Sequence, residues 1–564
     1  MASYRSPRRA DVGMKAPIAD VRRTLLRALP LMAAISLPAF ADTFTVLNTA
    51  DAGAGSFRQA IIDANNKQVT DGSRCAPHTI DFAIAGAGPH TIALLSPLPK
   101  INIPITFDGY SQPGSSENTA SIGSNAVLQI EIDGSLAGST DAFVVGAAIP
   151  GSPLCPGNTS VFRGLVINRF AGAAISMGEE FCPVGQFCNS GGVLIQGNYI
   201  GTDVTGTQAR GNGIALARPA LVFGTSSVVN VVGDQTLESG GPMNPSGATR
   251  NVISGNGADA VLIFSASSDF SSGLSRAHTI RNNYIGLDAS GAAALPNAGR
   301  GIEVGLNSSA ILIYDNLISA NGSDGIAILD TQFGGTSVIG NGIGIGVTGQ
   351  PFGNGGYGVL VNGNSIGVTV GSRFRFAPTA AAISNNAGAG VFVDDLAVVD
   401  AGNLSSAGNG GLAFDIAPAG VNPNDAGDGD SGPNERLNSP TLASVTIDPS
   451  TLEGSIVGSI GAEPNTTYEI HFFLNDVCDA GGSGGGQTPY PLSPMPSGVN
   501  VTTDASGNAS FVRAAQFLPQ GKFLTSLARR FSTTSAVPAL IVSEFSNCVP
   551  IASSADLIFV DGFD

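Results

Sequence analysis

The chain has no tryptophan, few cysteines and little charge. Only 12% of its 564 residues are charged, no lysine occurs between Lys100 and Lys522, and the formal net charge is −17. An acidic chain with so few cations is poorly suited to nucleic acid or to anionic membrane surfaces, so we predict neither partner. Beyond the N-terminal region no apolar run reaches the 18 residues that a membrane-spanning helix needs, and we expect no transmembrane segment.

Glycine and apolar residues are abundant instead. Glycine supplies 76 residues, roughly double the usual share of about 7%, and 43% of the chain is hydrophobic. This composition is sufficient for a large buried core, and the length is compatible with several domains.

The N-terminal region has the features of an export signal. Residues 21–41 read VRRTLLRALPLMAAISLPAFA, in which three arginines precede a short apolar stretch and Ala39-Phe40-Ala41 fits the small-x-small cleavage rule. We therefore predict that residues 1–41 are a signal peptide and that the protein is exported, to the medium or the outer cell surface. The alternative is an amphipathic core helix.

Six cysteines in an oxidising compartment are expected to form disulfides, and six allow 15 pairings. Two lie in the same C-terminal module and two others lie close in sequence. The expected pairs are Cys478–Cys548, Cys182–Cys188 and, by elimination, Cys75–Cys155.

Residues 160–420 repeat themselves loosely. Asn198-Tyr-Ile-Gly-Thr-Asp is echoed by Asn283-Tyr-Ile-Gly-Leu-Asp, and both units are followed by a Gly-x-Gly-Ile segment. Short strands of the form Gly-apolar-x-apolar begin at Gly301, Gly325, Gly358, Gly390 and Gly411. Their spacing varies between 21 and 33 residues, so we interpret the longer intervals as one coil plus a loop insertion.

The repeats predict a parallel β-helix. A unit of about 20–25 residues with three short strands cannot bury its apolar face alone, whereas stacked coils can. Recurrent asparagines at one corner would then stack as a ladder of side-chain amides. A β-propeller or a leucine-rich array is the alternative, but the Trp-Asp and Leu-x-x-Leu-x-Leu signatures are absent. Residues 56–65 predict an amphipathic helix with Ser56 as its N-cap, which would cover the first coil.

The segment TFTVLNTADAGAGSFRQAI, which begins at Thr43, resembles the entry motif of bacterial secreted right-handed parallel β-helix repeat proteins. The segments Pro89-His-Thr-Ile, Leu98-Pro and Phe107-Asp-Gly-Tyr-Ser-Gln-Pro-Gly114 resemble that family as well. The resemblance covers roughly residues 43–550 and implies a pectin-lyase-like fold. It implies no particular activity, since the family has no uniform one.

The pattern changes after residue 420. Residues 421–440 form an acidic linker rich in glycine, asparagine and proline, and residues 441–550 contain longer alternating segments typical of a small antiparallel β-sandwich. This module resembles the immunoglobulin-like domain that often follows such β-helices. Residues 551–564 form a tail whose last residues resemble a terminal tag of some exported proteins. The predicted fold is therefore all-β: a right-handed parallel β-helix over 42–420 with a helical cap, then the sandwich.

No residue stands out as catalytic. Asp203 and Asp288 occupy the same repeat position, but the third unit has Gly346 there, which favours a structural turn. The neighbours Asp394 and Asp395 are a weak acid pair. Arginine candidates for a lyase base, which we interpret as solvated loop residues, are Arg163, Arg169, Arg210, Arg250, Arg281 and Arg300.

One candidate cation site lies in the acidic linker. Asp425, Asp428 and Asp430, with Glu435 nearby, offer hard oxygen ligands in a glycine-rich loop, which suits Ca²⁺. The spacing differs from that of an EF-hand, and the alternative is a solvated acidic linker without a metal. Calcium is the only cofactor that the sequence suggests.

Two functions follow from this organisation. The preferred one is a non-catalytic surface or secreted scaffold that binds an extracellular polysaccharide, another surface glycan or matrix. The other is a polysaccharide lyase or glycoside hydrolase, with long insertions near 217–250 and 264–280 as walls of a groove. Carboxylates that converge with an arginine on one face would favour the enzyme. A face of Ser, Thr, Asn and small apolar side chains would favour the binder.

Overall fold

The fold was established from a computed structural model. The structure describes residues 41–71, 77–146, 159–178, 192–225, 227–235, 246–265, 275–371, 382–479, 482–490, 498–535 and 538–554. The predicted signal peptide, except its last residue, lies outside these ranges, as do the last ten residues of the tail and parts of both predicted groove walls. The predicted pairs Cys75–Cys155 and Cys182–Cys188 lie outside them as well. Among the described residues, no helix is long and apolar enough to cross a membrane.

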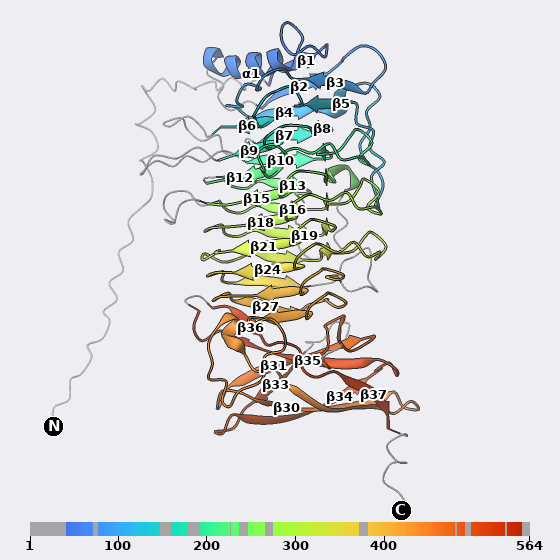
Figure 1. The fold of residues 1–564 in the computed structure, drawn as a ribbon, viewed down its shortest axis with the longest axis vertical. Coiled ribbons are helices and arrows are strands. Elements are labelled where there is room, and N and C mark those ends of the chain that lie inside the picture. The colour runs from blue at the N-terminus through green and yellow to red at the C-terminus, as the bar shows by residue number, and fades with distance from the viewer. Residues whose placement is uncertain are drawn as a thin grey trace, which may run out of the picture. The chain divides into compact units, whose positions relative to one another are not determined.

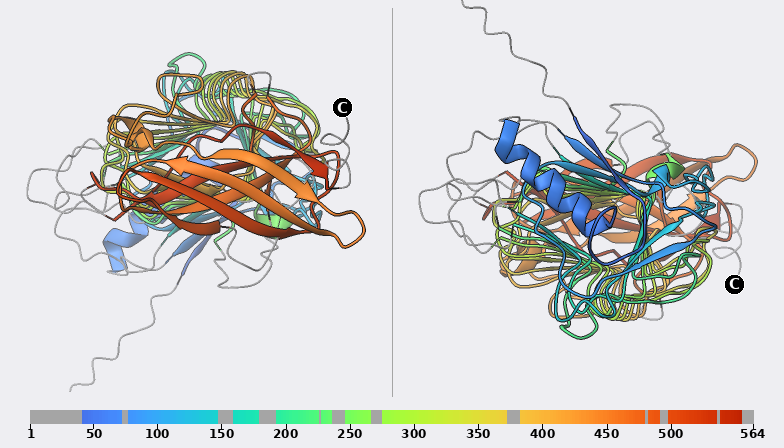
Figure 2. Two further views of the ribbon diagram at one scale, coloured as in Figure 1. Left: turned by 90° about the horizontal axis from the view of Figure 1, so that it is seen from below. Right: turned by 90° about the horizontal axis from the view of Figure 1, so that it is seen from above.

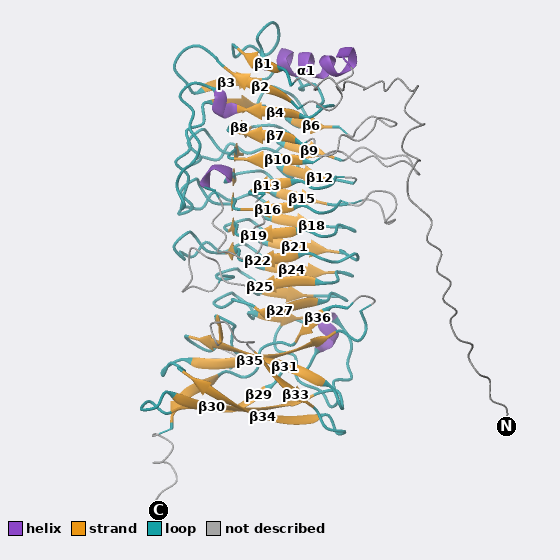
Figure 3. Cartoon of the chain, turned by 180° about the vertical axis from the view of Figure 1, so that it is seen from behind, coloured by secondary structure: helices purple, strands orange, loops and turns teal. Residues whose placement is uncertain are grey.

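Within these ranges, the first 28 strands form three parallel sheets (Figures 1 and 3). Sheet A contains β1 (Thr43–Val46), β2 (His78–Phe82), β4 (Ile105–Asp108), β7 (Ser160–Arg163), β10 (Val193–Gln196), β13 (Val231–Gly233), β16 (Thr279–Arg281), β19 (Leu312–Tyr314), β22 (Ser337–Ile339), β25 (Val368–Gly371) and β27 (Val399–Asn403). Sheet B contains β3 (His90–Ala93), β5 (Ile130–Asp133), β8 (Leu165–Asn168), β11 (Tyr199–Ile200), β14 (Val252–Ile253), β17 (Tyr284–Ile285), β20 (Leu317–Ile318) and β23 (Gly342–Ile343). Sheet C contains β6 (Phe143–Val145), β9 (Ile175–Met177), β12 (Leu221–Phe223), β15 (Val261–Ile263), β18 (Ile302–Val304), β21 (Ile326–Leu329), β24 (Val359–Asn362), β26 (Val391–Val393) and β28 (Phe414–Ile416).

The remaining strands form the C-terminal module. They are β29 (Thr441–Ile447), β30 (Glu453–Gly461), β31 (Thr467–Asn475), β32 (Thr488–Tyr490), β33 (Gly498–Thr502), β34 (Asn508–Gln516), β35 (Phe523–Phe531), β36 (Leu540–Val542) and β37 (Val549–Ser553). The helices are α1 (Phe57–Asp71) and the short 3-10 turns Gly109–Ser111, Gly247–Thr249 and Pro433–Arg436.

The predicted parallel β-helix is confirmed. Successive strands of each sheet pair in parallel, and like residues stack on like: Ile302 pairs with Ile326, which pairs with Val359. These intervals of 24 and 33 residues each make one coil, so the longer one is a coil with a loop insertion, as expected. Inward-facing Ile, Val and Phe side chains form one continuous core along the stack. Alternation along each strand sends the intervening side chains outward.

The expected asparagine ladder is present, and it has a counterpart at a second corner. Asn251 donates from Nδ2 to Asn283 Oδ1 at 2.8 Å, and Asn283 donates likewise to Asn316 at 2.9 Å. The ladder between sheets A and B consists of Asn198, Asn251, Asn283, Asn316 and Asn341. The ladder between sheets B and C consists of Asn212, Asn256, Asn297, Asn321, Asn354, Asn386 and Asn409. Both give buried turns the hydrogen bonds that water cannot supply.

The N-terminal helix covers the first coil, as predicted, and extends beyond residue 65. Ser56 Oγ accepts a hydrogen bond from the Gln59 amide at 3.2 Å, which confirms the N-cap. Phe57 is fully buried and its ring lies 5.6–6.0 Å from three phenylalanine rings of the first coils. Seen along the stack, α1 crosses one end and the C-terminal module crosses the other (Figure 2).

The strands of the C-terminal module form one nine-stranded sheet with a core of its own. Residues of β29 and β30, such as Val445 and Ile456, pack with Tyr468 and Phe472 of β31. Most strands pair antiparallel, as expected, but β29 and β37 pair in parallel. The last strand, β37, also extends three residues into the segment predicted as a tail. Cys478 and Cys548 form the expected disulfide.

The module also closes the end of the β-helix, which the sequence analysis did not anticipate. Phe473 and Leu527 face away from the core of the module and join the core of the β-helix. Arg529 of β35 forms an ion pair at 2.7 Å with Asp400 of β27. A solenoid needs its ends covered, and this module is the second cover.

A long loop covers the outer face of sheet B. This crossing loop, residues 115–127, leaves the coil of β4 and β5 and extends along the stack to β17. The Gly123 amide donates to the Tyr284 hydroxyl at 2.9 Å, and the Ser124 amide donates to the Ala289 carbonyl at 2.7 Å. Arg250, which is 1% exposed, donates to the carbonyls of Ser121 and Gly123.

Candidate functional site

Two columns of residues run along the outer face of sheet C. The first lies two residues before each strand and is polar on the middle coils. The second, at the second residue of each strand, is mostly apolar, as in Val222, Leu262, Ala327 and Leu360. Because β15, β18 and β21 are in register, Asp259, Arg300 and Asp324 are successive members of the first column. Glu303 belongs to the second column, beside Arg300.

Arg300 joins these acids. Its Nε lies 3.1 Å from Asp324 Oδ2, and its Nη1 contacts the carboxylate of Glu303. Its backbone amide donates to Asp259 Oδ1 at 2.6 Å. The side chains of Arg300 and Glu303 are 29% and 20% exposed, so the cluster is partly open to solvent. Three carboxylates and one guanidinium therefore meet across three neighbouring coils.

Burial and the neighbouring Glu303 change the pKa of one acid in the cluster, Asp259. Burial raises the pKa of Asp259, and the nearby Glu303 carboxyl raises it further through its charge and through hydrogen bonding, against the lowering effect of the Arg300 amide. Two carboxyl groups this close cannot both ionise freely. Burial also acts on Arg300, but Glu303 and Asp324 raise its pKa overall. The cluster therefore combines a fixed cation with a carboxyl that holds its proton to a higher pH than usual.

An aromatic pair continues the face on the next two coils. Tyr357 stacks on Phe392 with ring centroids 4.6 Å apart and an interplanar angle of 6°. The Tyr357 amide donates to Asp324 Oδ1 at 2.9 Å, which links the ring pair to the acid cluster. On the following strand, burial raises the pKa of Asp415 to about 6.

The glycines of the repeat make room for these acids. A Cβ on Gly299 or Gly356 would collide with the carboxylate of Asp259 or Asp324 from the preceding coil. The sequence analysis noted the glycine that starts each strand but missed the residue before it. That residue is Arg300, Asp324 or Tyr357 in successive repeats, and this was the available signal.

The acidic residues that the sequence suggested as catalytic accept hydrogen bonds from their own turns. Asp203 accepts hydrogen bonds from Thr205 Oγ1 and from backbone amides of its own turn, and Asp288 does the same in the equivalent turn. Asp394 accepts from the amide of Asp395. These contacts account for all three side chains without a ligand.

The arginine candidates have different environments. Arg250 and Arg281 are each 1% exposed, so the interpretation of them as solvated loop residues was wrong. Arg163 is partly exposed and pairs with Asp108 at 2.9 Å on sheet A. Arg169 pairs with Glu131 and Asp133 beside sheet B, and Arg300 pairs with Glu303 and Asp324 on sheet C. Convergence of this kind is the condition that favours an enzyme.

The structure brings the three predicted calcium ligands together in the linker. One oxygen from each of Asp425, Asp428 and Asp430 lies within 4.8 Å of the others. Asp428 is buried, which raises its pKa to about 6, and its Oδ1 accepts from the Asn438 amide at 2.8 Å. Asp425 Oδ2 accepts from the Gly429 amide at 3.0 Å. The acids thus have protein partners, and the calcium site stays a prediction.

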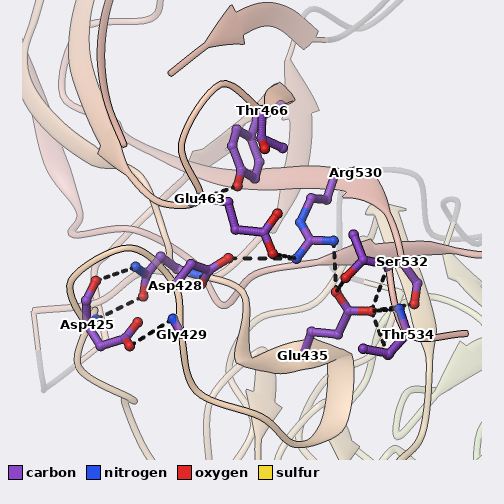
Figure 4. A network of polar contacts seen from close by, with 12 residues as sticks. Asp425, Asp428, Gly429, Glu435, Glu463, Thr466, Arg530, Ser532 and Thr534 are labelled. Carbon is purple, nitrogen blue, oxygen red and sulfur yellow. Dashed lines mark hydrogen bonds and ion pairs between the residues drawn. The ribbon is translucent and has the colours of Figure 1, made fainter. Parts of the chain in front are cut away.

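A buried arginine holds this linker against the module (Figure 4). Arg530 lies 2.8 Å from Glu435 Oε2 and 3.2 Å from Glu463 Oε1, and 3.8 Å from Asp428 Oδ2. Burial acts to raise the pKa of Glu435, but hydrogen bonds from Ser532 and Thr534 lower it to about 2. The linker is therefore a fixed part of the junction, and Glu435 serves that junction.

Comparisons with known proteins find no matching family model and no matching curated protein. Among solved structures, the chain is similar to the A-module of the mannuronan C-5 epimerase AlgE6 of Azotobacter vinelandii, with 14% identity, a TM-score of 0.36, and coverage of 66% of this chain and 79% of that one. It is also similar to the tailspike protein gp49 of the Acinetobacter baumannii bacteriophage Fri1, a capsular polysaccharide depolymerase, with 8% identity, a TM-score of 0.17, and coverage of 83% and 77%.

Proposed function

We propose that the protein is an exported glycan-binding protein and that the glycan lies along the outer face of sheet C. One observation carries the proposal: the Arg300 cluster adjoins the Tyr357–Phe392 pair on consecutive coils. Five strands, from β15 to β26, span roughly 19 Å at about 4.8 Å per strand, which is enough for a short run of sugar residues. Carboxylates and a guanidinium bind hydroxyl groups. Phe392 is buried, so the partly exposed ring of Tyr357 is the aromatic surface that would pack against a sugar ring.

Two observations support the export. The sequence predicts a signal peptide over residues 1–41, and the Cys478–Cys548 disulfide is typical of proteins that mature in an oxidising compartment.

A glycan array followed by titration calorimetry tests the binding. We expect Arg300→Ala and Tyr357→Ala each to weaken the best glycan at least tenfold. Arg163→Ala is the matched control, because Arg163 is also partly exposed and also pairs with two acids, but on sheet A. Equal binding by all three variants, or no glycan bound by the wild type, would contradict the proposal.

Catalysis at the same face is the second candidate. The raised pKa of Asp259 beside Glu303 favours it, because perturbed carboxyl pairs are typical of acid–base sites. The geometry argues for binding first, since the Arg300 guanidinium is already paired with Glu303 and Asp324, which leaves Asp259 as the acid of the cluster without an ion pair to that guanidinium among the described contacts.

Incubation with a polysaccharide panel, with and without Ca²⁺, separates the two candidates. An enzyme would release reducing ends or unsaturated products, and Asp259→Asn and Glu303→Gln would abolish release while the glycan still binds. Binding without any product supports the scaffold.

A further inference from the structure

The strand β34 is the open edge of the C-terminal module. The sheet order ends at β34, which pairs with β30 on one side only. Figure 1 shows it at the end of the molecule farthest from α1. Edge strands present unpaired backbone groups to solvent, which makes them templates for another strand.

Hydrogen bonds at both ends of β34 determine which residues face the open edge. The Gly507 carbonyl accepts from Ala462, and the Phe517 amide donates to Leu452, so odd-numbered residues bond toward β30. Backbone bonds alternate along an antiparallel pair, and even-numbered residues therefore face outward. At one end, the backbone amide of Asn508 donates to Asp504 Oδ1 and its carbonyl accepts from the Asp504 amide. At the other end, the backbone amide of Gln516 donates to the Tyr490 hydroxyl, and that hydroxyl donates to the Gln516 carbonyl.

Three residues remain with backbone groups on the open edge: Ser510, Val512 and Ala514. Among the described residues, none is a hydrogen-bond partner of these groups. The side chains of all three are exposed, and Val512 is 71% exposed.

The edge carries only one of the usual protections. Natural edge strands are blocked by lysine, proline, bulges or charges, including charges that point inward. The strand reads NASFVRAAQ, and its single charged residue, Arg513, lies with its guanidinium 5.2 Å from the Phe472 ring centroid, on the core side of the sheet. The solvent side is uncharged.

We propose that β34 pairs with β34 of a second copy of this chain and forms a twofold-symmetric dimer. The occupant follows from the symmetry of the edge, because the capped residues Asn508 and Gln516 lie four residues on either side of Val512. Two such edges in antiparallel contact place Val512 opposite its own copy and Ser510 opposite Ala514. Each of the three residues then exchanges both of its backbone hydrogen bonds, and no charge opposes the contact.

Light scattering and sedimentation over a concentration series of the purified protein test this dimer. We expect twice the chain mass at high concentration, and we expect Val512→Lys to raise the dimer dissociation constant at least tenfold by placing two lysines opposite each other. Val477→Lys is the matched control, because Val477 is also 71% exposed but lies in a turn after β31. Circular dichroism checks that both variants fold.

Hydrogen exchange gives a second readout at the backbone. The amides of Ser510, Val512 and Ala514 should exchange more slowly as concentration rises in the wild type, and at a constant rate in Val512→Lys. A wild type that stays monomeric at 100 µM, or a dimer that Val512→Lys leaves intact, would overturn the proposal.

Discussion

Sheets B and C belong to the same coils, but their outer faces differ in character. Beneath the crossing loop, the outward positions of sheet B hold Val166, Tyr199 and Tyr284, all nearly inaccessible. Sheet C also has buried outward residues, Val222 and Ala327, but on a coil between them Arg300 and Glu303 are partly exposed. A strand in a β-helix has one face committed to the core, so the loops around it decide whether its other face becomes a second core or a surface.

Residues beneath the crossing loop are therefore expected to serve stability, and the exposed residues of sheet C to serve glycan binding. Substitutions beneath the crossing loop are expected to change stability and leave glycan affinity intact. Substitutions on sheet C are expected to do the reverse. The predictions below test that separation, beginning with the largest effect.

Arg250→Ala should be the most damaging. It removes a buried guanidinium that donates to the carbonyls of Ser121 and Gly123 and lies over the Tyr284 ring, and we expect a loss of about 3–5 kcal/mol in the free energy of unfolding. Denaturant titration measures this loss, with Arg163→Ala as a control expected to cost less than about 1 kcal/mol. A loss of glycan affinity in folded Arg250→Ala would break the division between the faces.

Two tyrosines provide a matched pair. Tyr284→Phe removes the acceptor of the buried Gly123 amide and should cost about 1–3 kcal/mol. Tyr357→Phe should cost less than about 0.5 kcal/mol, because no residue in the described part of the chain hydrogen-bonds its hydroxyl. Thermal and chemical unfolding of both variants measures the contrast. Equal losses would show that the two faces are equally structural.

Glu303→Gln should lower the pKa of Asp259, because it removes the neighbouring carboxylate that helps burial raise that pKa. Asp259 binds its proton more tightly in the folded protein than in the unfolded chain, so its contribution to stability is full at low pH. That contribution is lost as pH rises through the raised pKa. We expect a smaller decline in the variant, and carboxyl-carbon NMR titration follows Asp259 directly. An unchanged titration would contradict the coupling.

The smallest effect is expected in the linker, which belongs to neither face. Calcium at about five times its dissociation constant would stabilise the protein by about 1 kcal/mol if Asp425, Asp428 and Asp430 bind it. Melting temperatures in CaCl₂ and in EDTA measure this, with Asp430→Asn as the variant that should lose the shift. An identical midpoint in both solutions favours a metal-free acidic linker.

The sequence was informative about the β-helix because its signals are local. Glycine before each strand and asparagine at each corner predict the coils and the ladder between sheets A and B. The second ladder could have been predicted, since Asn212 is the variable residue of the Gly-x-Gly-Ile segment that follows the Asn198 unit. The C-terminal closure also had a signal in β31, where His471 and Phe473 alternate with buried Ile470 and Phe472, so both faces of the strand are covered.

The acid cluster was harder to find because it depends on register. Asp259 and Arg300 are 41 residues apart, whereas Arg300 and Asp324 are 24 apart, yet both pairs lie on adjacent coils. Loops of unequal length hide this equivalence from a count along the chain. The burial of Arg250 could not be predicted either, because the crossing loop that covers it lies about 130 residues earlier in the sequence.

The closure of the last coil by Phe473 and Leu527 determines how long this spiral can be. A parallel stack is an open-ended architecture, and any bare terminal winding invites the next chain to continue it. Because the C-terminal module covers the last coil, a second chain cannot stack on that end, and the length of the β-helix is defined. In a chain truncated before residue 441 the last coil would be uncovered, and we expect such chains to associate end to end into fibres.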